Sequence, residues 1–214
     1  MDENYRSISE KFIKGTTTIG VICSDGVVLG ADSRATMDTF IASSEAIKVY
    51  QINDKVGMTI AGGVGDAEYL VRMVKAQNEL YKLNEGVDMS PNAVNSILSI
   101  ILQENKMMPF YVQVIVGGLD HANTPFLYSL DPLGGYSQES KFTSTGSGSL
   151  TALGFLEESY KKEKTTKEVI KDVAKALQIA MKRDSATGDR ITIATITKDG
   201  YREYSGSELD KLLK

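Results

Sequence analysis

Short apolar runs joined by tight turns dominate this chain, and they restrict the folds open to it more than any other feature. The β-branched runs Thr17–Cys23 and Val27–Asp32 are separated by Ser24-Asp25-Gly26, which is a hairpin signature. Two further strands are predicted at Ala46–Ile52 and Val56–Ala61. Strands that follow one another through such short turns pair antiparallel, because a parallel pair needs a long crossover. The sequence therefore predicts antiparallel sheets.

Two pairs of amphipathic helices interrupt the strands. The first pair is predicted to begin at Gly65-Asp66 and at Ser90-Pro91, where serine can cap a helix and proline can occupy its first turn. The second pair is predicted at Ser147–Tyr160 and after the capping box that begins at Thr165 and includes Glu168. Mostly apolar side chains recur on one face of three of these helices. The first face has Leu70, Met73, Val74, Leu80 and Tyr81, with the polar Gln77 among them; the others have Val94, Ile97, Leu98, Ile101 and Leu102, and Val169, Ile170, Val173, Leu177, Ala180 and Met181.

The order of the predicted elements defines a fold class. Strands return at Tyr111–Leu119 and Phe126–Leu130, and a closing hairpin is predicted at Ile191–Ile196 and Tyr201–Tyr204. The chain thus runs strands, two helices, strands, two helices, strands. Each helix must bury its apolar face against a sheet. We therefore expect an α+β fold, a four-layer αββα sandwich of two antiparallel sheets covered by helices, in one domain of 214 residues.

Charge and composition exclude several classes of partner. The formal net charge is −4, with 24 Lys and Arg against 28 Asp and Glu, which argues against nucleic acid or an anionic membrane as a partner. No run approaches the roughly 18 apolar residues of a membrane span. Residues 1–15 are polar and lack the apolar region of a secretory signal, so we expect a cytoplasmic protein with a short leader of another kind.

The chain has one cysteine and one histidine, and this limits its chemistry. Cys23 lies in an apolar run typical of a buried strand, and His121 lies in a turn-like segment. One residue of each type cannot form an internal disulfide or a zinc site of several cysteines or histidines. A cysteine in a buried strand and a histidine in a surface turn also argue against a Cys-His mechanism. We expect neither a metal nor a cofactor.

The segment Gly15-Thr16-Thr17-Thr18 is the strongest chemical candidate. If the chain is cut between Gly15 and Thr16, the new α-amino group lies on the same residue as the Thr16 hydroxyl. Its pKa of about 7.7–8.0 lets it accept the hydroxyl proton near neutral pH. Threonine with its own terminal amine is a known activated nucleophile. Alternatively, these β-branched residues simply begin a strand.

A glycine-rich loop at Gly62-Gly63-Val64-Gly65 precedes the first helix. Such loops can bind phosphate, but the stretch Gly63-Val64-Gly65-Asp66-Ala67-Glu68 lacks the third glycine of the phosphate-binding pattern and places two acidic residues at the helix start. Two acidic residues at a helix start repel phosphate. The loop is better explained as a tight strand-to-helix turn or as a backbone donor to a reacting oxygen, and the two explanations are compatible.

From Thr16 onward the chain resembles the β subunits of proteasome core particles, which are N-terminal-nucleophile hydrolases with threonine peptidase activity. The resemblance covers nearly all of 16–214 and is nearest to the archaeal form. The matching pieces are Gly15-Thr16-Thr17-Thr18, Gly30-Ala31-Asp32-Ser33-Arg34-Ala35-Thr36, Lys48, Ala61-Gly62-Gly63-Val64-Gly65-Asp66, Gly146-Ser147-Gly148-Ser149, and Arg183-Asp184 followed by Gly188.

The resemblance implies a role for several of these residues. Thr16 would be the nucleophile, Lys48 would place its ammonium beside Thr16, and Asp32 would pair with Lys48. Without the resemblance, Lys48 would be an edge or solvated lysine and Asp32 a turn former. Arg34 would supply supporting charge, and the Gly62 N–H would donate to the oxyanion.

Three more residues are implied to surround the terminal amine of Thr16. Ser147 and Asp184 match family positions that hydrogen-bond there, although Ser147 alone would be taken for a helix N-cap. Thr187 stands where the family often has serine, and it retains the hydroxyl. By the same mapping a pocket that selects apolar side chains would be lined by Ala35, Thr36, Ala46, Tyr50, Ile60, Val64 and Glu68.

The expected function follows from the resemblance. Residues 1–15 would be a propeptide, removed by autocatalytic cleavage between Gly15 and Thr16, and 16–214 the catalytic domain. Seven β subunits would form a ring stacked on a second β ring, with α subunits and an ATP-dependent unfoldase as partners and unfolded proteins as substrates. Two alternatives remain open: a catalytically silent ring subunit, and a small-molecule amidohydrolase of the same superfamily.

Overall fold

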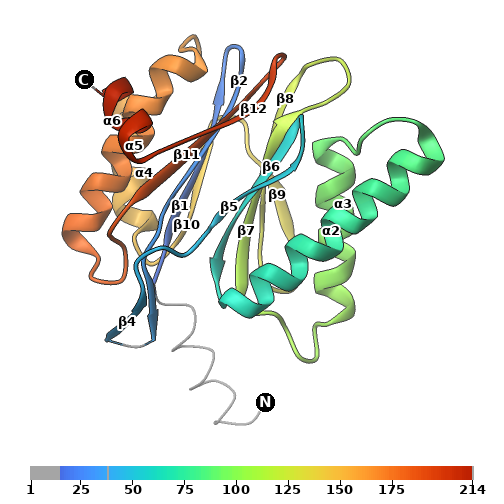
Figure 1. Cartoon of the computed structure of the whole chain (residues 1–214), viewed down its shortest axis with the longest axis horizontal. Coiled ribbons are helices and arrows are strands. Elements are labelled where there is room, and N and C mark those ends of the chain that lie inside the picture. The colour runs from blue at the N-terminus through green and yellow to red at the C-terminus, as the bar shows by residue number, and fades with distance from the viewer. Residues whose placement is uncertain (1–14, 38, 214) are drawn as a thin grey trace.

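Two five-stranded antiparallel sheets face each other in the structure, a computed structural model that describes residues 15–37 and 39–213 (Figure 1). The first sheet has the order β10-β1-β2-β11-β12, with bounds Phe142–Gly146, Thr17–Cys23, Gly26–Asp32, Ile191–Thr197 and Gly200–Ser205. The second has the order β5-β6-β7-β8-β9, with bounds Val49–Asn53, Val56–Gly62, Val112–Leu119, Pro125–Leu130 and Tyr136–Gln138.

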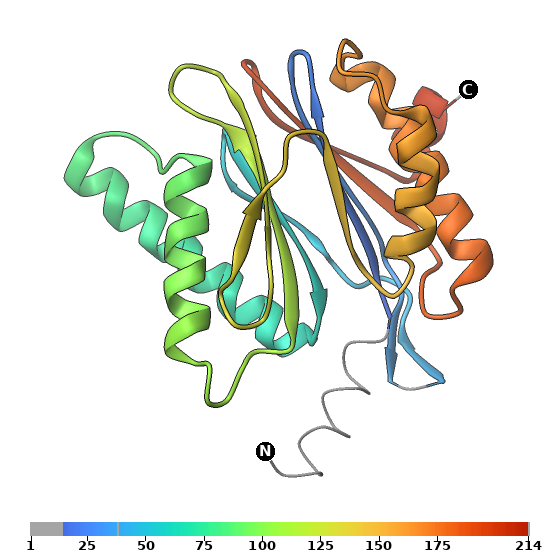
Figure 2. The ribbon, with the colours of Figure 1, turned by 180° about the vertical axis from the view of Figure 1, so that it is seen from behind.

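A pair of helices covers the outer face of each sheet, as Figures 1 and 2 show from opposite sides. Helices α2 (Val64–Glu85) and α3 (Pro91–Glu104) pack on the second sheet, and α4 (Ser149–Ser159) and α5 (Thr166–Arg183) pack on the first. The expected four-layer αββα sandwich is thereby confirmed. None of the helices within residues 15–37 and 39–213 is long and apolar enough to cross a bilayer.

Three apolar layers hold these four layers together. Between the second sheet and its helices lie side chains such as Met58, Leu70 and Leu98, and between the first sheet and its helices lie others such as Ile19 and Val173. The third layer lies between the sheets and contains Val27, Leu29, Ile115, Leu119, Leu127 and Ile196. Burial on both faces explains why the strands read as nearly continuous apolar runs.

Local signals in the sequence explain the positions of most elements. The strands β1 and β2 form the predicted hairpin, with Cys23 opposite Gly26 across a two-residue turn. Ser90 caps α3 by accepting a hydrogen bond of 3.3 Å from the N–H of Ala93. The capping box at Thr165 and Glu168 is present at the start of α5.

The structure differs from the expectation in several places. A small hairpin of β3 (Ala35–Met37) and β4 (Phe40–Ser43) and a C-terminal helix α6 (Gly206–Leu213) were not expected. The strand expected from Ala46 begins only at Val49, because the residues before it cross from one sheet to the other. Leu80 was expected to face the core but is 51% exposed, since Asn78 takes the buried position in that turn of α2.

Candidate active site

Thr16 lies immediately before β1 and is 4% exposed. Its backbone N–H points to the Ser147 Oγ at 3.5 Å, and its Oγ1 donates a short hydrogen bond to the carbonyl oxygen of Gly15. The same carbonyl oxygen lies 3.4 Å from the Nζ of Lys48. The Gly15–Thr16 peptide bond is therefore flanked by a hydroxyl and an amino group.

Asp32 organises the base of this site from the end of β2. Its Oδ1 accepts hydrogen bonds of 2.9 Å from the Thr17 N–H and from Lys48 Nζ. Its Oδ2 accepts from the N–H groups of Arg34 at 3.1 Å and Gly188 at 2.9 Å. The Asp32 side chain is fully buried and has no access to bulk water. The four donors take the place of that hydration and so offset the cost of burying a carboxylate. Asp32 is thus more than a turn former.

Lys48 immediately precedes β5, and its side chain extends to the Asp32 carboxylate. Its side chain is 7% exposed, and its Nζ also donates to the carbonyl oxygen of Arg34 at 2.6 Å. Burial lowers the pKa of Lys48 below its ordinary value, and the neighbouring Asp32 charge offsets part of that shift. Lys48 is therefore a buried lysine paired with Asp32 near Thr16, and not a solvated edge residue.

Two hydroxyl groups meet the carboxylate of Asp184 near Thr16. The Oδ2 of Asp184 accepts hydrogen bonds from the hydroxyls of Ser147 and Thr187. The Thr187 Oγ1 is also 2.8 Å from the Oγ1 of Thr17. Ser147 does not cap α4, because that helix has Gly148 at its N-cap position. The structure thus brings Ser147, Asp184 and Thr187 together, and the Ser147 hydroxyl is the one of these groups that lies 3.5 Å from the Thr16 nitrogen.

Arg34 braces the segment that carries Thr187. Its Nε and Nη2 donate to the two carboxylate oxygens of Asp189 at 2.9 and 3.3 Å, and its Nη1 donates to the Ser185 carbonyl oxygen at 2.9 Å. The hydrogen bond to Asp189 raises the pKa of Arg34, so the guanidinium stays charged. Arg34 acts on the shape of this loop and does not contact Thr16 in the structure.

Gly62 ends β6 at the opposite wall of the site. Its φ is +138°, and an added Cβ would lie 1.9 Å from the carbonyl oxygen of Tyr111. Both observations exclude a larger residue there. The strand ladder pairs Gly62 with Val112, so β7 fixes the position of the Gly62 peptide.

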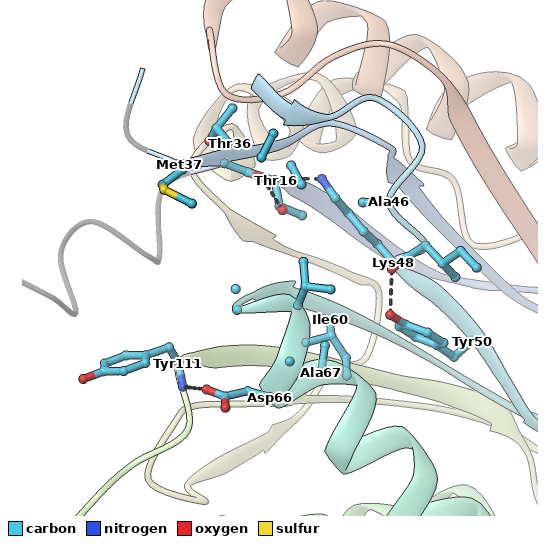
Figure 3. A pocket seen from close by; sticks show the side chains of 18 residues that line it. Thr16, Thr36, Met37, Ala46, Lys48, Tyr50, Ile60, Asp66, Ala67 and Tyr111 are labelled. Carbon is cyan, nitrogen blue, oxygen red and sulfur yellow. Dashed lines mark hydrogen bonds between the residues drawn. The ribbon is translucent and has the colours of Figure 1, made fainter. Parts of the chain in front are cut away.

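A pocket of about 440 Å³ opens between Thr16 and α2 (Figure 3). Thr16 and Lys48 lie on one side of it, and Ile60 and Ala67 lie on the other. The Tyr50 hydroxyl donates to the Ile47 carbonyl oxygen at 2.7 Å, and burial, with Glu68 adding to it, raises the pKa of Tyr50 to about 12. Six of the expected residues line this pocket: Ala35, Thr36, Ala46, Tyr50, Ile60 and Val64.

Glu68 is the one expected lining residue that this pocket does not include. Its side chain is exposed on α2, because the helical turn presents Val64 and Ala67 to the pocket and directs Glu68 toward solvent. The pocket instead contains another acidic residue, Asp66, whose Oδ2 accepts a hydrogen bond of 2.8 Å from the Tyr111 N–H.

Sequence reasoning also missed several lining residues. Met37 and Ala42 come from the unexpected β3–β4 hairpin, and Tyr111 comes from the segment before β7. The only signal available for Asp66 was an acidic residue in the first turn of a helix, which is too common to identify a site. Residues 15–37 and 39–213 contain no group of three or more His, Cys, Asp or Glu side chains placed to hold a metal ion.

Comparison with known proteins agrees with the resemblance. A family profile described as "Proteasome subunit" matches residues 13–196. The chain belongs to the proteasome subunit family. It is similar to "Proteasome subunit beta" of Methanocaldococcus vulcanius, with 48% identity over 94% of this chain and 90% of that protein. The proteins of the same description from Methanococcus vannielii and Methanosarcina barkeri are 47% and 45% identical, over 96% and 95% of this chain and 94% and 96% of theirs.

These relatives make the chain a proteasome subunit of the archaeal β type. Family membership also supports a place in a proteasome core particle and suggests a hydrolase.

Proposed function

We propose that this β subunit is a threonine endopeptidase of a proteasome core particle, with Thr16 as its nucleophile. One observation carries the proposal: the Thr16 hydroxyl contacts the carbonyl of the bond expected to be cut, within reach of the buried Asp32–Lys48 pair. Lys48 beside this hydroxyl lowers the cost of forming an alkoxide. A strand residue with no chemical role would not need a buried ion pair next to it.

Activation would begin at the Gly15–Thr16 bond. The Thr16 Oγ attacks the Gly15 carbonyl carbon, the C–N bond breaks, and the nitrogen takes the proton to become an amine. Water then hydrolyses the resulting ester, which releases residues 1–15 and restores the hydroxyl. Gly15 suits this junction, because its φ is +141° and an added Cβ would lie 2.3 Å from the Thr36 Oγ1.

Peptide cleavage would use the amine set free in that step. The amine accepts the hydroxyl proton as Thr16 attacks the substrate carbonyl, and Gly62 donates its N–H to the oxyanion. The amine then protonates the leaving group, and water hydrolyses the acyl-enzyme. Ser147, which is held by Asp184, lies beside the Thr16 nitrogen and orients it.

The remaining parts of the proposal concern substrate and assembly. A pocket lined mostly by apolar side chains favours cleavage after hydrophobic residues of unfolded proteins. We propose a seven-membered β ring stacked on a second one, α subunits as further rings, an ATP-dependent unfoldase as regulator, and a cytoplasmic location. Residues 1–15 would keep each subunit inactive until assembly.

Two alternatives are less well supported. A catalytically silent ring subunit would have no use for a buried Asp32–Lys48 pair that contacts the same Gly15 carbonyl oxygen as the Thr16 hydroxyl. A small-molecule amidohydrolase of the same superfamily predicts turnover of a small amide by the unassembled chain. The proteasome proposal predicts peptide cleavage by a large particle.

The substitution Thr16→Ala tests the proposal, with Thr16→Ser as the matched control that keeps a hydroxyl. Particles assembled with α subunits would be compared by intact mass and by cleavage of a fluorogenic peptide. We expect Thr16→Ala to keep residues 1–15 and to lose roughly 10⁴-fold or more in kcat/KM. Thr16→Ser should remove the leader and retain measurable activity. Normal leader removal in Thr16→Ala would show that another group cuts the bond.

A further inference from the structure

Gln113 connects the two sheets beside Thr16. It lies on β7, and its Oε1 accepts a hydrogen bond of 3.0 Å from the N–H of Gly146 at the end of β10. These strands belong to different sheets, so the bond crosses the layer between them. Gln113 and Gly146 are both half-buried, which partly shields the bond from water.

Gly146, the donor in this bond, packs directly against Thr16. Gly146 pairs with Thr17 in the β1–β10 ladder, and an added Cβ on Gly146 would lie 2.0 Å from the Thr16 carbonyl oxygen. Ser147, whose hydroxyl lies beside the Thr16 nitrogen, is the next residue. A shift of the Gly146 peptide would therefore move the Thr16 backbone and the Ser147 hydroxyl together.

Gln113, the acceptor in this bond, lies on β7, which pairs with the strand that carries Gly62. In the β6–β7 ladder Gln113 lies opposite Ala61, and the preceding residue Val112 lies opposite Gly62. One side chain thus connects the wall with the proposed oxyanion donor to the wall with the nucleophile. An oxyanion donor is effective only where the substrate oxygen arrives after attack, so the separation of these walls matters for the rate.

We propose that Gln113 is a positioning residue that sets the separation of Gly62 and Thr16 through the Gly146 peptide. The proposal rests on the proposed function of Thr16 as nucleophile. Gln113 does not line the pocket and does not contact Thr16, so it acts through Gly146. A second link between the sheets is made by Lys48, which precedes β5 and donates to Asp32 at the end of β2.

The test compares four variants in particles assembled with α subunits. Gln113→Met keeps the length of the side chain and removes the oxygen, and Gln113→Asn withdraws the oxygen by one methylene group. Gln113→Glu keeps an acceptor oxygen at full length. Gln138→Met makes the same change at an exposed position on β9 of the same sheet. Two readouts are used: kcat and KM for a peptide, and deuterium exchange of the segment 142–147.

We expect Gln113→Met and Gln113→Asn to lower kcat roughly 10- to 100-fold while KM stays within about twofold of the unmodified particle. Both should speed amide exchange in 142–147. Gln113→Glu and Gln138→Met should resemble the unmodified particle in both readouts. Either loss variant suffices if the other fails to assemble.

The proposal is overturned if amide exchange in 142–147 is unchanged in an assembled loss variant, or if Gln113→Glu is impaired as severely as Gln113→Met. It is also overturned if kcat is unaffected. An unmodified particle no more active than Thr16→Ala would contradict the proposed function itself. The exchange measurement would then still decide whether Gln113 holds Gly146.

Discussion

At the scale of single residues, Lys48 is the group whose behaviour departs furthest from what its type suggests. A lysine on an exposed strand would be fully charged far above neutral pH. Here burial lowers the pKa of Lys48, while the contact with Asp32 keeps the charged form accessible. The proposed mechanism needs that charged form beside the Thr16 hydroxyl, so the lowered pKa sets an upper pH limit on activity.

We expect a bell-shaped dependence of kcat/KM on pH. The acidic limb should follow the Thr16 amine, because activity rises as this amine loses its proton near pH 7.7–8.0. The alkaline limb should fall below the ordinary lysine value of about 10.4, because Lys48 loses its proton early. The measurement is a pH profile of peptide cleavage by the processed particle.

Stability measured over the same pH range provides the control. The folded state releases the Lys48 proton at lower pH than the unfolded chain, so between these two pKa values the unfolded state binds more protons. The contribution of Lys48 to stability therefore rises with pH in this window and is lost as pH falls through the folded pKa. Titration of Lys48 would thus lower activity without unfolding the protein. An alkaline limb at or above pH 10.4 would contradict the assignment.

At the scale of elements, helix boundaries follow from local chemistry. Ser90 and Pro91 start α3 where the sequence predicts it, since the capping hydrogen bond joins residues three apart. The same holds for Thr165 and Glu168 at α5. Strands behave differently. The β3–β4 hairpin has no comparable turn signal. The other residues that line the pocket with this hairpin, such as Tyr111, lie far from it in sequence.

Removing the cap of α3 should have a measurable but modest effect. We expect Ser90→Ala to lower the free energy of unfolding by about 1 kcal/mol, because the Ala93 N–H loses its acceptor. Ser137→Ala, at an exposed position on β9, should change it far less. Denaturant unfolding of the purified chain measures both. Equal effects of the two substitutions would show that Ser90 does not cap the helix in solution.

At the scale of the whole molecule, glycines determine how closely the sheets approach. Gly117 on β7 faces β2, where an added Cβ would lie 2.8 Å from Val27 Cγ1 and 3.1 Å from Leu29 Cδ2. Gly20 on β1 faces β7 and β8 in the same way, with contacts of 2.9 Å to Ile115 and 2.7 Å to Leu127. Because Thr16 and Gly62 belong to different sheets, this spacing also fixes the width of the active site.

We therefore expect Gly117→Val to affect both stability and catalysis from a position outside the pocket. Overpacking of the layer between the sheets should cost about 1–3 kcal/mol of unfolding free energy. The wider sheet separation should lower kcat more than it changes KM. Denaturant unfolding and peptide kinetics measure the two effects.

Gly154→Ala is the matched control for this substitution. Gly154 lies in α4 with no atom near an added Cβ, and alanine there should stabilise the helix by roughly 0.5–1 kcal/mol. Full activity and full stability of Gly117→Val would contradict the idea that close sheet packing sets the geometry of the site.

The sequence by itself determined the layer order, the starts of α3 and α5, and the candidate residues Thr16, Asp32 and Lys48. Hairpin turns, caps and periodicity act over a few residues, so they can be recognised without the rest of the chain. Recognition of the site also depended on the family resemblance, because each short motif is weak when taken alone.

Tertiary structure alone decided what surrounds those residues. Four donors converge on Asp32, Glu68 lies outside the pocket while Asp66 lies within it, and Gln113 reaches Gly146 from the other sheet. Each of these contacts depends on strand register and sheet spacing across the molecule. Such distances are set by the packing of the whole core, and no local pattern of residues encodes them.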